Sequence, residues 1–253
     1  MRSLRIRQTA KSVLQGLILI SSLLDVLGRF AILQLRYGRS LSLRQRADWL
    51  HSACKTIVRR LSMSVSACGS LPATGLIVSN HLSYLDILFY ASLMPCIFVS
   101  KSEVLSWPLF GILARCGGTI FVERDRMHSV DEPARRIADA LTTGVPVVLF
   151  PEGTSSDGRT VLPFRATLFQ SAIITRSPIL PAAISYLLAD GVEADLCYYG
   201  EITFLPHLFG ALARERVEAK ISFEGEARIY SDRKIAASSA WQDVVSLREA
   251  VTA

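Results

Sequence analysis

The stretch LIVSNHLSYLDILFYASL, residues 76–93, contains the alternation on which the rest of the chain is built. Its first four residues, Leu76–Ser79, form a short apolar run of the kind that makes a strand buried on both faces. Ser83 is a typical helix N-cap residue, so a helix is predicted over Ser83–Ser92. A buried strand that leads through a polar turn into a helix is the repeating unit of an α/β fold.

The same alternation of short apolar runs with helical stretches continues on both sides, from residue 64 to the C-terminus. Further strands are predicted at Ser64–Cys68, Cys96–Ser100, Thr119–Val122, Val147–Phe150, Ile179–Tyr186, Ala194–Tyr199 and Lys220–Tyr230. Further helices are predicted at Ser106–Arg115, Ser129–Thr143, Arg165–Thr175 and Ala236–Ala250, with loops at Leu187–Gly191 and Leu205–Gly210. The predicted fold class is therefore α/β.

The N-terminal quarter differs from the rest in charge. Residues 1–60 contain twelve Lys and Arg but only two acidic residues, although the whole chain has 28 basic and 22 acidic residues. An apolar run begins at Val13 and continues to Leu35, interrupted by Asp25 and Arg29. These two residues are four apart and can pair on a helix. The uninterrupted part is too short to span a bilayer, and the whole stretch spans only with that pair inside.

A second helical pattern follows, in which apolar residues share one face and most Lys and Arg lie away from it. The apolar face consists of Leu43, Ala47, Leu50, Cys54, Ile57 and Leu61. A basic amphipathic helix of this kind is typical of a membrane surface. We therefore divide the chain into membrane-association helices over residues 1–62 and a catalytic domain over residues 63–253.

The partner of the basic segment is expected to be anionic, which leaves lipid and nucleic acid as candidates. Apolar helices favour anionic lipid, so no nucleic acid is expected. Two other interpretations remain open. Both helices can simply pack on the domain, or the segment can be a cleaved signal peptide, although Asp25 rather than small residues follows the apolar run.

Composition and cysteine usage exclude several classes of protein. With 50% hydrophobic and 20% charged residues, the chain can bury a core and is not disordered. The five cysteines are dispersed, with no C-x-x-C pair, so we expect free thiols in a reducing compartment. The four histidines show no ligand spacing, so no metal site is expected.

Polar residues stand at the ends of three predicted strands, where open α/β sheets gather their ligands. The segments are NHLSYLD (80–86), GGTIFVER (117–124) and FPEGTSSDG (150–158). In the first, Asp86 can hold one nitrogen of His81 and make the other a better base. Taken singly, each segment keeps a plainer interpretation: a capping Asp beside a packed His, a surface ion pair of Arg124, and an ordinary turn at Glu152.

A serine hydrolase needs a nucleophile elbow, G-x-S-x-G, and the chain has none. Gly153-Thr-Ser155 begins like one, but Gly158 comes one residue late. The chain also lacks a P-loop and a G-x-G-x-x-G motif.

Together and in this order, the segments resemble the glycerolipid acyltransferase family typified by 1-acyl-glycerol-3-phosphate acyltransferases, over about residues 65–190. NHLSYLD is similar to the family's Asn-His-x-x-x-x-Asp block, GTIFVER (118–124) to its second block and FPEGT (150–154) to its third. LPAAI (180–184) is similar to its fourth.

The resemblance implies an O-acyltransferase that moves an acyl group from acyl-CoA or acyl carrier protein to the hydroxyl of a lyso-lipid. It implies His81 as general base, oriented by Asp86, with no metal and no cofactor beyond the thioester co-substrate. It implies that Arg124, Glu152, Gly153 and Thr154 hold the acceptor head group, and Lys101 stands where the family often has Lys. Ser155, at a position where the chain departs from the family, and the nearby cation Arg165 complete the predicted substrate-binding set. It also implies the family's fold, an α/β fold with a central, mostly β sheet flanked by helices, preceded by the two-helix membrane motif.

One departure bears on the acceptor. The family members that act on lysophosphatidic acid usually have Arg where this chain has Ser155. The expected acceptor is 1-acyl-glycerol-3-phosphate, giving phosphatidic acid, and the alternative is lyso-ornithine lipid. More distant alternatives are a lipid esterase and an inactive lipid-binding protein.

The thioester donor and the reduced cysteines imply a cytoplasmic catalytic domain at the inner membrane, held as a peripheral, monotopic or single-span protein. Anionic membrane lipids are the expected partners of the basic helices.

Overall fold

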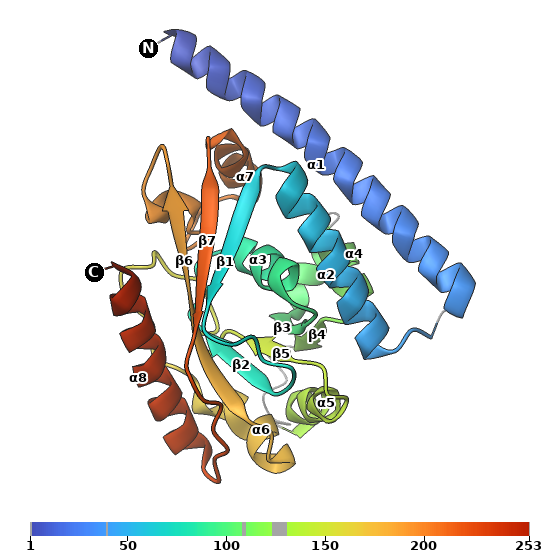
Figure 1. The fold of residues 1–253 in the computed structure, drawn as a ribbon, viewed down its shortest axis with the longest axis vertical. Coiled ribbons are helices and arrows are strands. Elements are labelled where there is room, and N and C mark those ends of the chain that lie inside the picture. Colours follow the sequence, from blue (N-terminus) through green and yellow to red (C-terminus); the bar gives the residue numbers. More distant parts are fainter. Residues whose placement is uncertain (1, 39, 108–109, 123–130, 253) are drawn as a thin grey trace.

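A twisted sheet lies at the centre of the molecule between two layers of helices (Figure 1). The computed structural model describes residues 2–38, 40–107, 110–122 and 131–252. Within these residues the strands are β1 Met63–Cys68, β2 Leu76–Ser79, β3 Ile97–Lys101, β4 Ile120–Val122, β5 Val147–Leu149, β6 Ile179–Leu188 and β7 Val217–Phe223. They form one sheet in the order β1-β7-β6-β2-β5-β3-β4. The predicted α/β class is confirmed.

The directions of the strands create one edge at which several chain segments leave the sheet together. β6, β2, β5, β3 and β4 are successive parallel neighbours, and only β7, which is antiparallel to β6, breaks this pattern, with β1 parallel to β7. The carboxyl ends of the parallel strands therefore lie along the same edge. Ser79, the last residue of β2, is opposite Ala182, so β6 continues well past the end of β2.

Helices cover both faces of the sheet. One face carries α1 Arg2–Tyr37, α2 Leu43–Arg60, α3 Leu85–Leu93, α4 Phe110–Cys116 and α7 Phe204–Ala213. The other carries α5 Asp131–Thr142, α6 Gln170–Thr175 and α8 Arg233–Thr252 (Figure 1). Short 3₁₀ helices lie at η1 Ser102–Ser106, η2 Ala166–Phe169 and η3 Glu193–Leu196.

The central strands are apolar throughout because both of their faces are buried. Ile77 of β2 belongs to the core under α2 and α3, whereas its neighbours Leu76 and Val78 belong to the core under α5, α6 and α8. Successive side chains of a strand point to opposite faces, so each strand contributes to both cores. This explains the short apolar runs in the sequence.

The two N-terminal helices use their apolar residues differently. Of the predicted apolar face of α2, five residues are buried in the protein core, namely Ala47, Leu50, Cys54, Ile57 and Leu61. The plainer interpretation, packing on the domain, is therefore correct for α2, and this face is not available to a membrane. The predicted pair of Asp25 with Arg29 is confirmed at 2.9 Å, and Arg60 of α2 binds the same carboxylate.

α1 leaves a large apolar surface exposed to solvent. It buries Leu19, Leu23, Val26 and Phe30 but exposes about half or more of Val13, Leu14, Leu17, Ile20, Leu24, Ile32 and Leu35. Within the part of the chain that the structure describes, Thr9–Tyr37 alone is long and apolar enough to cross a membrane, judged by length and composition.

Two predicted elements are wrong. The predicted strand Ala194–Tyr199 is the 3₁₀ helix η3 followed by an irregular segment, because Leu196 and Cys197 are buried where η3 packs against β6 and α7 rather than by strand pairing. The predicted loop Leu205–Gly210 is helix α7. Its Pro206 is the third helical residue, where the backbone needs no N–H donor, so a proline there does not break a helix.

Other predicted boundaries need smaller corrections. β6 continues to Leu188, inside the predicted loop Leu187–Gly191, and β7 ends at Phe223 rather than at Tyr230. The predicted helix Ser106–Arg115 starts later, as α4 from Phe110, and Ser106 itself is the last residue of η1. The predicted helix Arg165–Thr175 is η2 followed by α6. The first two residues of the predicted helix Ser129–Thr143 lie outside the described residues.

Candidate active site

The loops that follow β2 and β5 meet at the carboxyl edge of the sheet, as the sequence predicted for strand ends. The backbone N–H of Ser156 donates to the carbonyl of His81 at 2.9 Å. The loop after β2 also accepts, at Leu82, a hydrogen bond of 2.8 Å from the Tyr198 N–H. Lys101 ends the neighbouring strand β3. Arg124, predicted to join them, lies outside the described residues.

His81 and Asp86 form a direct pair. The imidazole Nδ1 lies 2.7 Å from Asp86 Oδ2, and the carboxyl group is fully buried in the first turn of α3. Because a carboxylate can only accept, Nδ1 carries the hydrogen. Nε2 is then the nitrogen with a free lone pair, and it is the one that can take a proton from a ligand.

The carboxylate of Asp86 is held by three further donors. Oδ2 accepts from the N–H groups of Leu82 at 2.8 Å and Ser83 at 3.1 Å, and Oδ1 accepts from the hydroxyl of Tyr186. Asp86 thus fixes the loop that carries His81 as well as the imidazole.

Ser83 was predicted to be the N-cap of α3, but that position is occupied by Tyr84, one residue later.

The imidazole is held between the buried carboxylate and an aromatic ring. It stacks on Phe150 with the ring centroids 4.2 Å apart and the planes 12° from parallel. About a fifth of the His81 side chain is exposed. One face and one nitrogen are therefore fixed by protein contacts while the remaining edge is open to a cavity.

Glu152 stands behind this pair rather than in the cavity. It is 3% exposed and does not line the cavity, and its Oε1 accepts from the His81 N–H at 3.4 Å. Burial raises the pKa of the Glu152 carboxyl to about 8, so much of it is protonated at neutral pH. This placement indicates a part in holding the His81 backbone, whereas the sequence resemblance implied substrate binding.

The other predicted binding residues that the structure describes do line the cavity. They are Lys101, Gly153, Thr154, Ser155 and Arg165, and with His81 we call them the polar wall. Gly153 has φ +71°, and a Cβ there would lie 2.9 Å from Arg165 Nε, so only glycine lets this guanidinium pack against the turn. The hydroxyl of Ser155 donates to the carbonyl of Tyr198.

The cavity has a volume of about 550 Å³, and most of its lining is apolar. We call the part formed by α1, α2 and α7 the apolar wall. It consists of Leu19 and Leu23 of α1, of Leu50, Ala53, Cys54 and Ile57 of α2, and of Leu208, Ala211 and Leu212 of α7. The cavity thus joins a polar, basic region to a long apolar one, which suits an amphipathic ligand.

Sequence reasoning missed several residues that build this site. Tyr84, Trp107 and Tyr198 form an aromatic cluster that lines the cavity, with ring centroids 5.4–6.4 Å apart. Tyr84 lies inside the first motif, but at a position that the motif leaves open. Trp107 and Tyr198 are far apart in sequence, and no local signal connects them.

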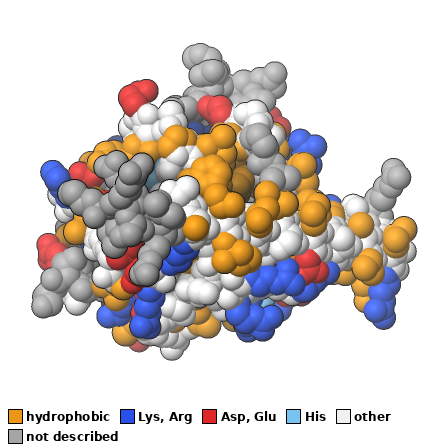
Figure 2. Space-filling model, turned by 90° about the horizontal axis from the view of Figure 1, so that it is seen from above, with side chains coloured by type: hydrophobic (Ala, Val, Ile, Leu, Met, Phe, Trp, Pro, Cys, Tyr) orange, Lys and Arg blue, Asp and Glu red, His pale blue; other side chains and the backbone are white. Residues whose placement is uncertain are grey.

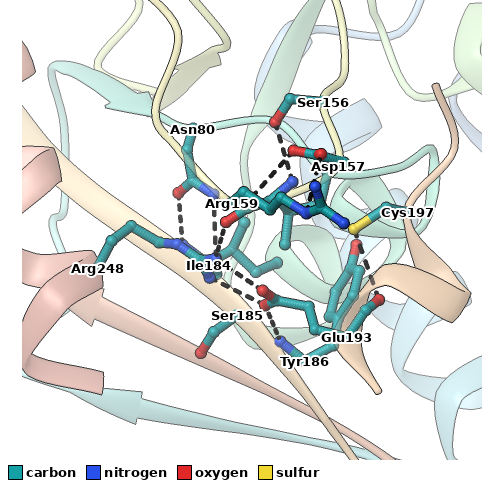
Figure 3. Close-up of polar contacts among 12 residues, drawn as sticks. Asn80, Ser156, Asp157, Arg159, Ile184, Ser185, Tyr186, Glu193, Cys197 and Arg248 are labelled. Atoms are coloured by element: carbon teal, nitrogen blue, oxygen red, sulfur yellow. Dashed lines mark hydrogen bonds and ion pairs between the residues drawn. The ribbon is translucent and has the colours of Figure 1, made fainter. Parts of the chain in front are cut away.

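Asn80, the first residue of the same motif, has a structural partner of its own. Its side-chain amide donates to the carbonyl of Ile184 at 3.1 Å and its Oδ1 accepts from the N–H of Ile184 at 2.9 Å (Figure 3). This reciprocal pair extends the contact between β2 and β6 beyond the end of β2. It explains why an amide, which both donates and accepts, stands before His81.

Comparisons with known proteins show that the chain is similar to acyltransferases. The sequence model of the family described as Acyltransferase matches residues 65–185. The lyso-ornithine lipid O-acyltransferase of Pseudomonas aeruginosa is 36% identical over 180 residues, which cover 69% of this chain and 67% of that protein. The protein of the same name from Rhizobium meliloti is 40% identical over 172 residues, covering 61% of this chain and 57% of that one.

The 1-acyl-sn-glycerol-3-phosphate acyltransferase of Neisseria gonorrhoeae is 31% identical over 148 residues, 58% of each chain. The chain thus matches less than two thirds of the length of the Rhizobium and Neisseria proteins. The crystal structure of PlsC from Thermotoga maritima, a 1-acyl-sn-glycerophosphate (LPA) acyltransferase, superposes with a TM-score of 0.73. It is 18% identical and covers 99% of this chain and 98% of its own, so the two folds are the same.

Proposed function

The chain belongs to the acyltransferase family, and on that premise we propose that it transfers a fatty acyl group from an acyl thioester to the hydroxyl of a lyso-lipid. The observation that carries the proposal is the pairing of His81 Nδ1 with buried Asp86 beside an amphipathic cavity. That arrangement leaves Nε2 as a base in a place where a lipid hydroxyl can reach it.

The reaction follows from these contacts. Nε2 of His81 removes the proton of the acceptor hydroxyl as the oxygen attacks the thioester carbonyl. The new O–C bond forms, the C–S bond breaks, and the imidazolium returns the proton to the departing thiolate. Asp86 holds the imidazole in the correct orientation and stabilises its positive charge. No acyl-enzyme intermediate is needed, because the acceptor itself is the nucleophile.

We place the charged head group against the polar wall and an acyl chain against the apolar wall. Lys101 and Arg165 are cationic and line the cavity, so they suit an acceptor with a carboxylate or phosphate. Arg124 keeps its predicted role in the same group as a proposal. Acyl-CoA or acyl carrier protein is the proposed donor, with no further cofactor.

We favour lyso-ornithine lipid as the acceptor. Relatives from Rhizobium, Brucella, Pseudomonas and Rhodobacter that carry this name are 35–40% identical. The Ser155 position, where lysophosphatidic acid enzymes usually have Arg, lines the cavity and supports the same choice. Lysophosphatidic acid is the second candidate, because relatives named for that activity are 30–34% identical.

An acceptor panel tests the function. The purified full chain is incubated with one acyl-CoA and, separately, with lyso-ornithine lipid, lysophosphatidic acid and lysophosphatidylcholine, and the product is identified by mass spectrometry. We expect diacylated ornithine lipid to form fastest. CoA release that is equally fast without any acceptor would indicate a thioesterase or esterase instead.

We also propose that α1 docks the protein on the inner membrane, with the catalytic domain on the cytoplasmic side. The exposed apolar residues of α1 continue into Leu205 and Phe209 of α7, because the two helices are in contact: Ser12 donates to the Phe209 carbonyl at 3.2 Å. Figure 2 shows hydrophobic side chains gathered in a band on this face, with Lys and Arg along one side. A surface of this kind fits an anionic bilayer.

Vesicle flotation tests the docking. Replacement of Leu14, Leu17 and Leu24 by Glu is expected to release the protein from anionic vesicles, whereas Glu at the equally exposed Ile229 and Ile235 is not. Removal of residues 1–60 is unsuitable, since it deletes the buried face of α2 from the core. Unchanged flotation of the α1 variant would place the membrane contact elsewhere.

A further inference from the structure

We propose that Tyr186 is a positioning residue that fixes the carboxylate of Asp86, so that Oδ2 alone is presented to His81. The proposal rests on the proposed function of the His81–Asp86 pair. Tyr186 lies outside the four motifs, just beyond the segment that matches the family.

Tyr186 reaches the pair from a different element. It lies on the extension of β6 past β2, is 3% exposed, and donates its hydroxyl to Asp86 Oδ1. Its ring lies 5.7 Å from the ring of Phe89 in α3, the helix that carries Asp86. Burial raises the pKa of the Tyr186 hydroxyl well above its usual value, so it remains a donor across the physiological range.

The two oxygens of Asp86 are used unequally. Oδ2 is in contact with His81 and accepts from Leu82 and Ser83, whereas the Tyr186 hydroxyl is the one donor found on Oδ1 within the described residues. Without that hydroxyl, Oδ1 is a buried acceptor with no partner. The negative charge is then less well stabilised and holds a protonated imidazole more strongly.

The backbone around Tyr186 is itself anchored. Its N–H donates to Glu193 Oε1 at 2.8 Å, and Arg248 of α8 binds both carboxylate oxygens of Glu193 at 2.7 and 2.9 Å. Figure 3 shows Arg248 pointing toward Glu193 and Ile184. Arg248 also donates to the carbonyls of Ile184 at 2.9 Å and Gly158 at 2.7 Å. The backbone position of Tyr186 is thus fixed by η3, by α8 and by the loop after β5, which carry Glu193, Arg248 and Gly158.

Other ionisable groups near Asp86 stay the same when Tyr186 is changed. They are His81 in the loop after β2, Tyr90 on α3, Glu152 after β5, Glu193 in η3, Cys197 directly after η3, and Arg248 on α8. An altered pH profile in a Tyr186 variant is therefore attributable to the lost hydroxyl.

The test compares Tyr186→Phe with Tyr90→Phe. Tyr90 is also fully buried, and its hydroxyl donates to Ser79 at 2.8 Å, so the control removes the same atom from the same kind of site. We expect Tyr186→Phe to lower kcat by about tenfold, to leave KM for both substrates nearly unchanged, and to move the acidic limb of the kcat profile to higher pH. Tyr90→Phe should do none of these.

A second variant covers the case in which Tyr186→Phe fails to fold. Replacement of Tyr186 by 3-fluorotyrosine keeps the ring and the hydroxyl but makes the hydroxyl a stronger donor. It should move the acidic limb to lower pH, opposite to Tyr186→Phe. A structural role alone gives no such reversal. An unchanged pH profile in either folded variant would overturn the proposal.

A measurement without substrate separates this proposal from the proposed function. The rate at which diethyl pyrocarbonate modifies His81, followed by peptide mass spectrometry across pH, reports the same imidazole directly. We expect the profile of Tyr186→Phe to move to higher pH even if no lyso-lipid is acylated, in which case only the proposed function fails. Acyl transfer with identical modification profiles in Tyr186→Phe and wild type would mean that the positioning role is wrong.

Discussion

The polar wall and the apolar wall of the cavity are built in different ways. Among the described residues of the polar wall, Lys101 is the last residue of β3, and the others lie in the segments that follow β2 and β5. Backbone hydrogen bonds fix these two segments: the Ser156 N–H donates to the His81 carbonyl, and the Arg165 N–H donates to the Pro151 carbonyl. The apolar wall comes from three helices, α1, α2 and α7, from opposite ends of the sequence, and packing holds it together. Hydrogen bonds, which are directional, position the reactive side chains of the short motifs. Hydrophobic packing between helices that are far apart in sequence, which is not directional, gives the cavity its shape.

This difference predicts that the two walls respond differently to substitution. Hydrogen-bonded groups at the polar wall must keep both atom type and geometry, so single atoms matter there. The apolar wall needs volume and hydrophobicity, so conservative changes should alter selectivity more than rate.

Replacement of His81 by Ala should have the largest effect. We expect kcat to fall by at least about 100-fold, because a positioned general base contributes about 10²–10⁴-fold. Thermal unfolding should change little, since the side chain is partly exposed. His51→Ala is the matched control: its Nδ1 contacts the Ala91 carbonyl, away from the cavity, so kcat should be retained. If the His81→Ala enzyme keeps more than a tenth of wild-type kcat, His81 is not the general base.

Glu152 tests how the polar wall is supported from behind. Its pKa is about 8 in the fold because of burial, against an ordinary value of 4.5, so the folded state holds a proton that the unfolded state releases. This contribution to stability is full below pH 4.5 and is lost progressively as pH rises toward 8. Between pH 5 and 7.5, wild type should lose roughly 2–3 kcal/mol relative to Glu152→Gln, at about 1.4 kcal/mol per pH unit.

Urea unfolding at several pH values in one detergent measures the difference. A wild type and a Glu152→Gln variant with parallel pH dependence would show that the Glu152 carboxyl is ionised in the folded protein.

Ser155→Arg tests whether position 155 of the polar wall recognises the head group of the acceptor lipid. An added guanidinium in the cavity should favour lysophosphatidic acid over lyso-ornithine lipid by about 1–2 kcal/mol in kcat/KM, the order of one charged hydrogen bond. Ser155→Ala is the control, because it loses the same contact with the Tyr198 carbonyl without adding a cation. If both variants change the acceptor ratio equally, the lost contact rather than the cation is responsible.

The apolar wall should give the smallest effect. Ala53 of α2 is 3% exposed and lines the cavity, so Ala53→Leu shortens the space for an acyl chain. We expect the preference for palmitoyl-CoA over decanoyl-CoA to fall by about threefold, with kcat for the shorter donor nearly unchanged; one buried methylene corresponds to about 0.8 kcal/mol. Ala240→Leu, equally buried in α8 but outside the cavity lining, should leave this ratio unchanged. Equal shifts in both variants would indicate general destabilisation.

Most of the sheet could be predicted from the sequence because its strands are short apolar runs between polar turns. β2 was predicted with its observed bounds, and the remaining strands with small errors at their ends, apart from β7. The predicted strand Ala194–Tyr199 was wrong because its apolar residues are buried by the packing of η3 against β6 and α7, and an apolar run does not distinguish this from a strand. Leu205–Gly210 was wrong because Pro and Gly were taken as breakers, although Pro206 lies in the first turn of α7, where it is tolerated.

The sequence by itself determined the pairing of His81 with Asp86, because a five-residue spacing across a strand–turn–helix unit brings the two side chains together. It also determined that the chain has an apolar, basic N-terminal segment. Only the tertiary structure decided which helix keeps that apolar surface exposed: α2 lies over the sheet and is buried, while α1 lies outside it.

The supports of the site were likewise decided only by the tertiary structure. Tyr186 and Arg248 come from β6 and α8, and their contacts with Asp86 and Glu193 arise from the sheet order and from the packing of α8 against β6. A local motif specifies groups that are neighbours along the chain. The partners that satisfy a buried charge come from wherever the fold brings a donor within about 3 Å, and no pattern of spacing encodes that distance.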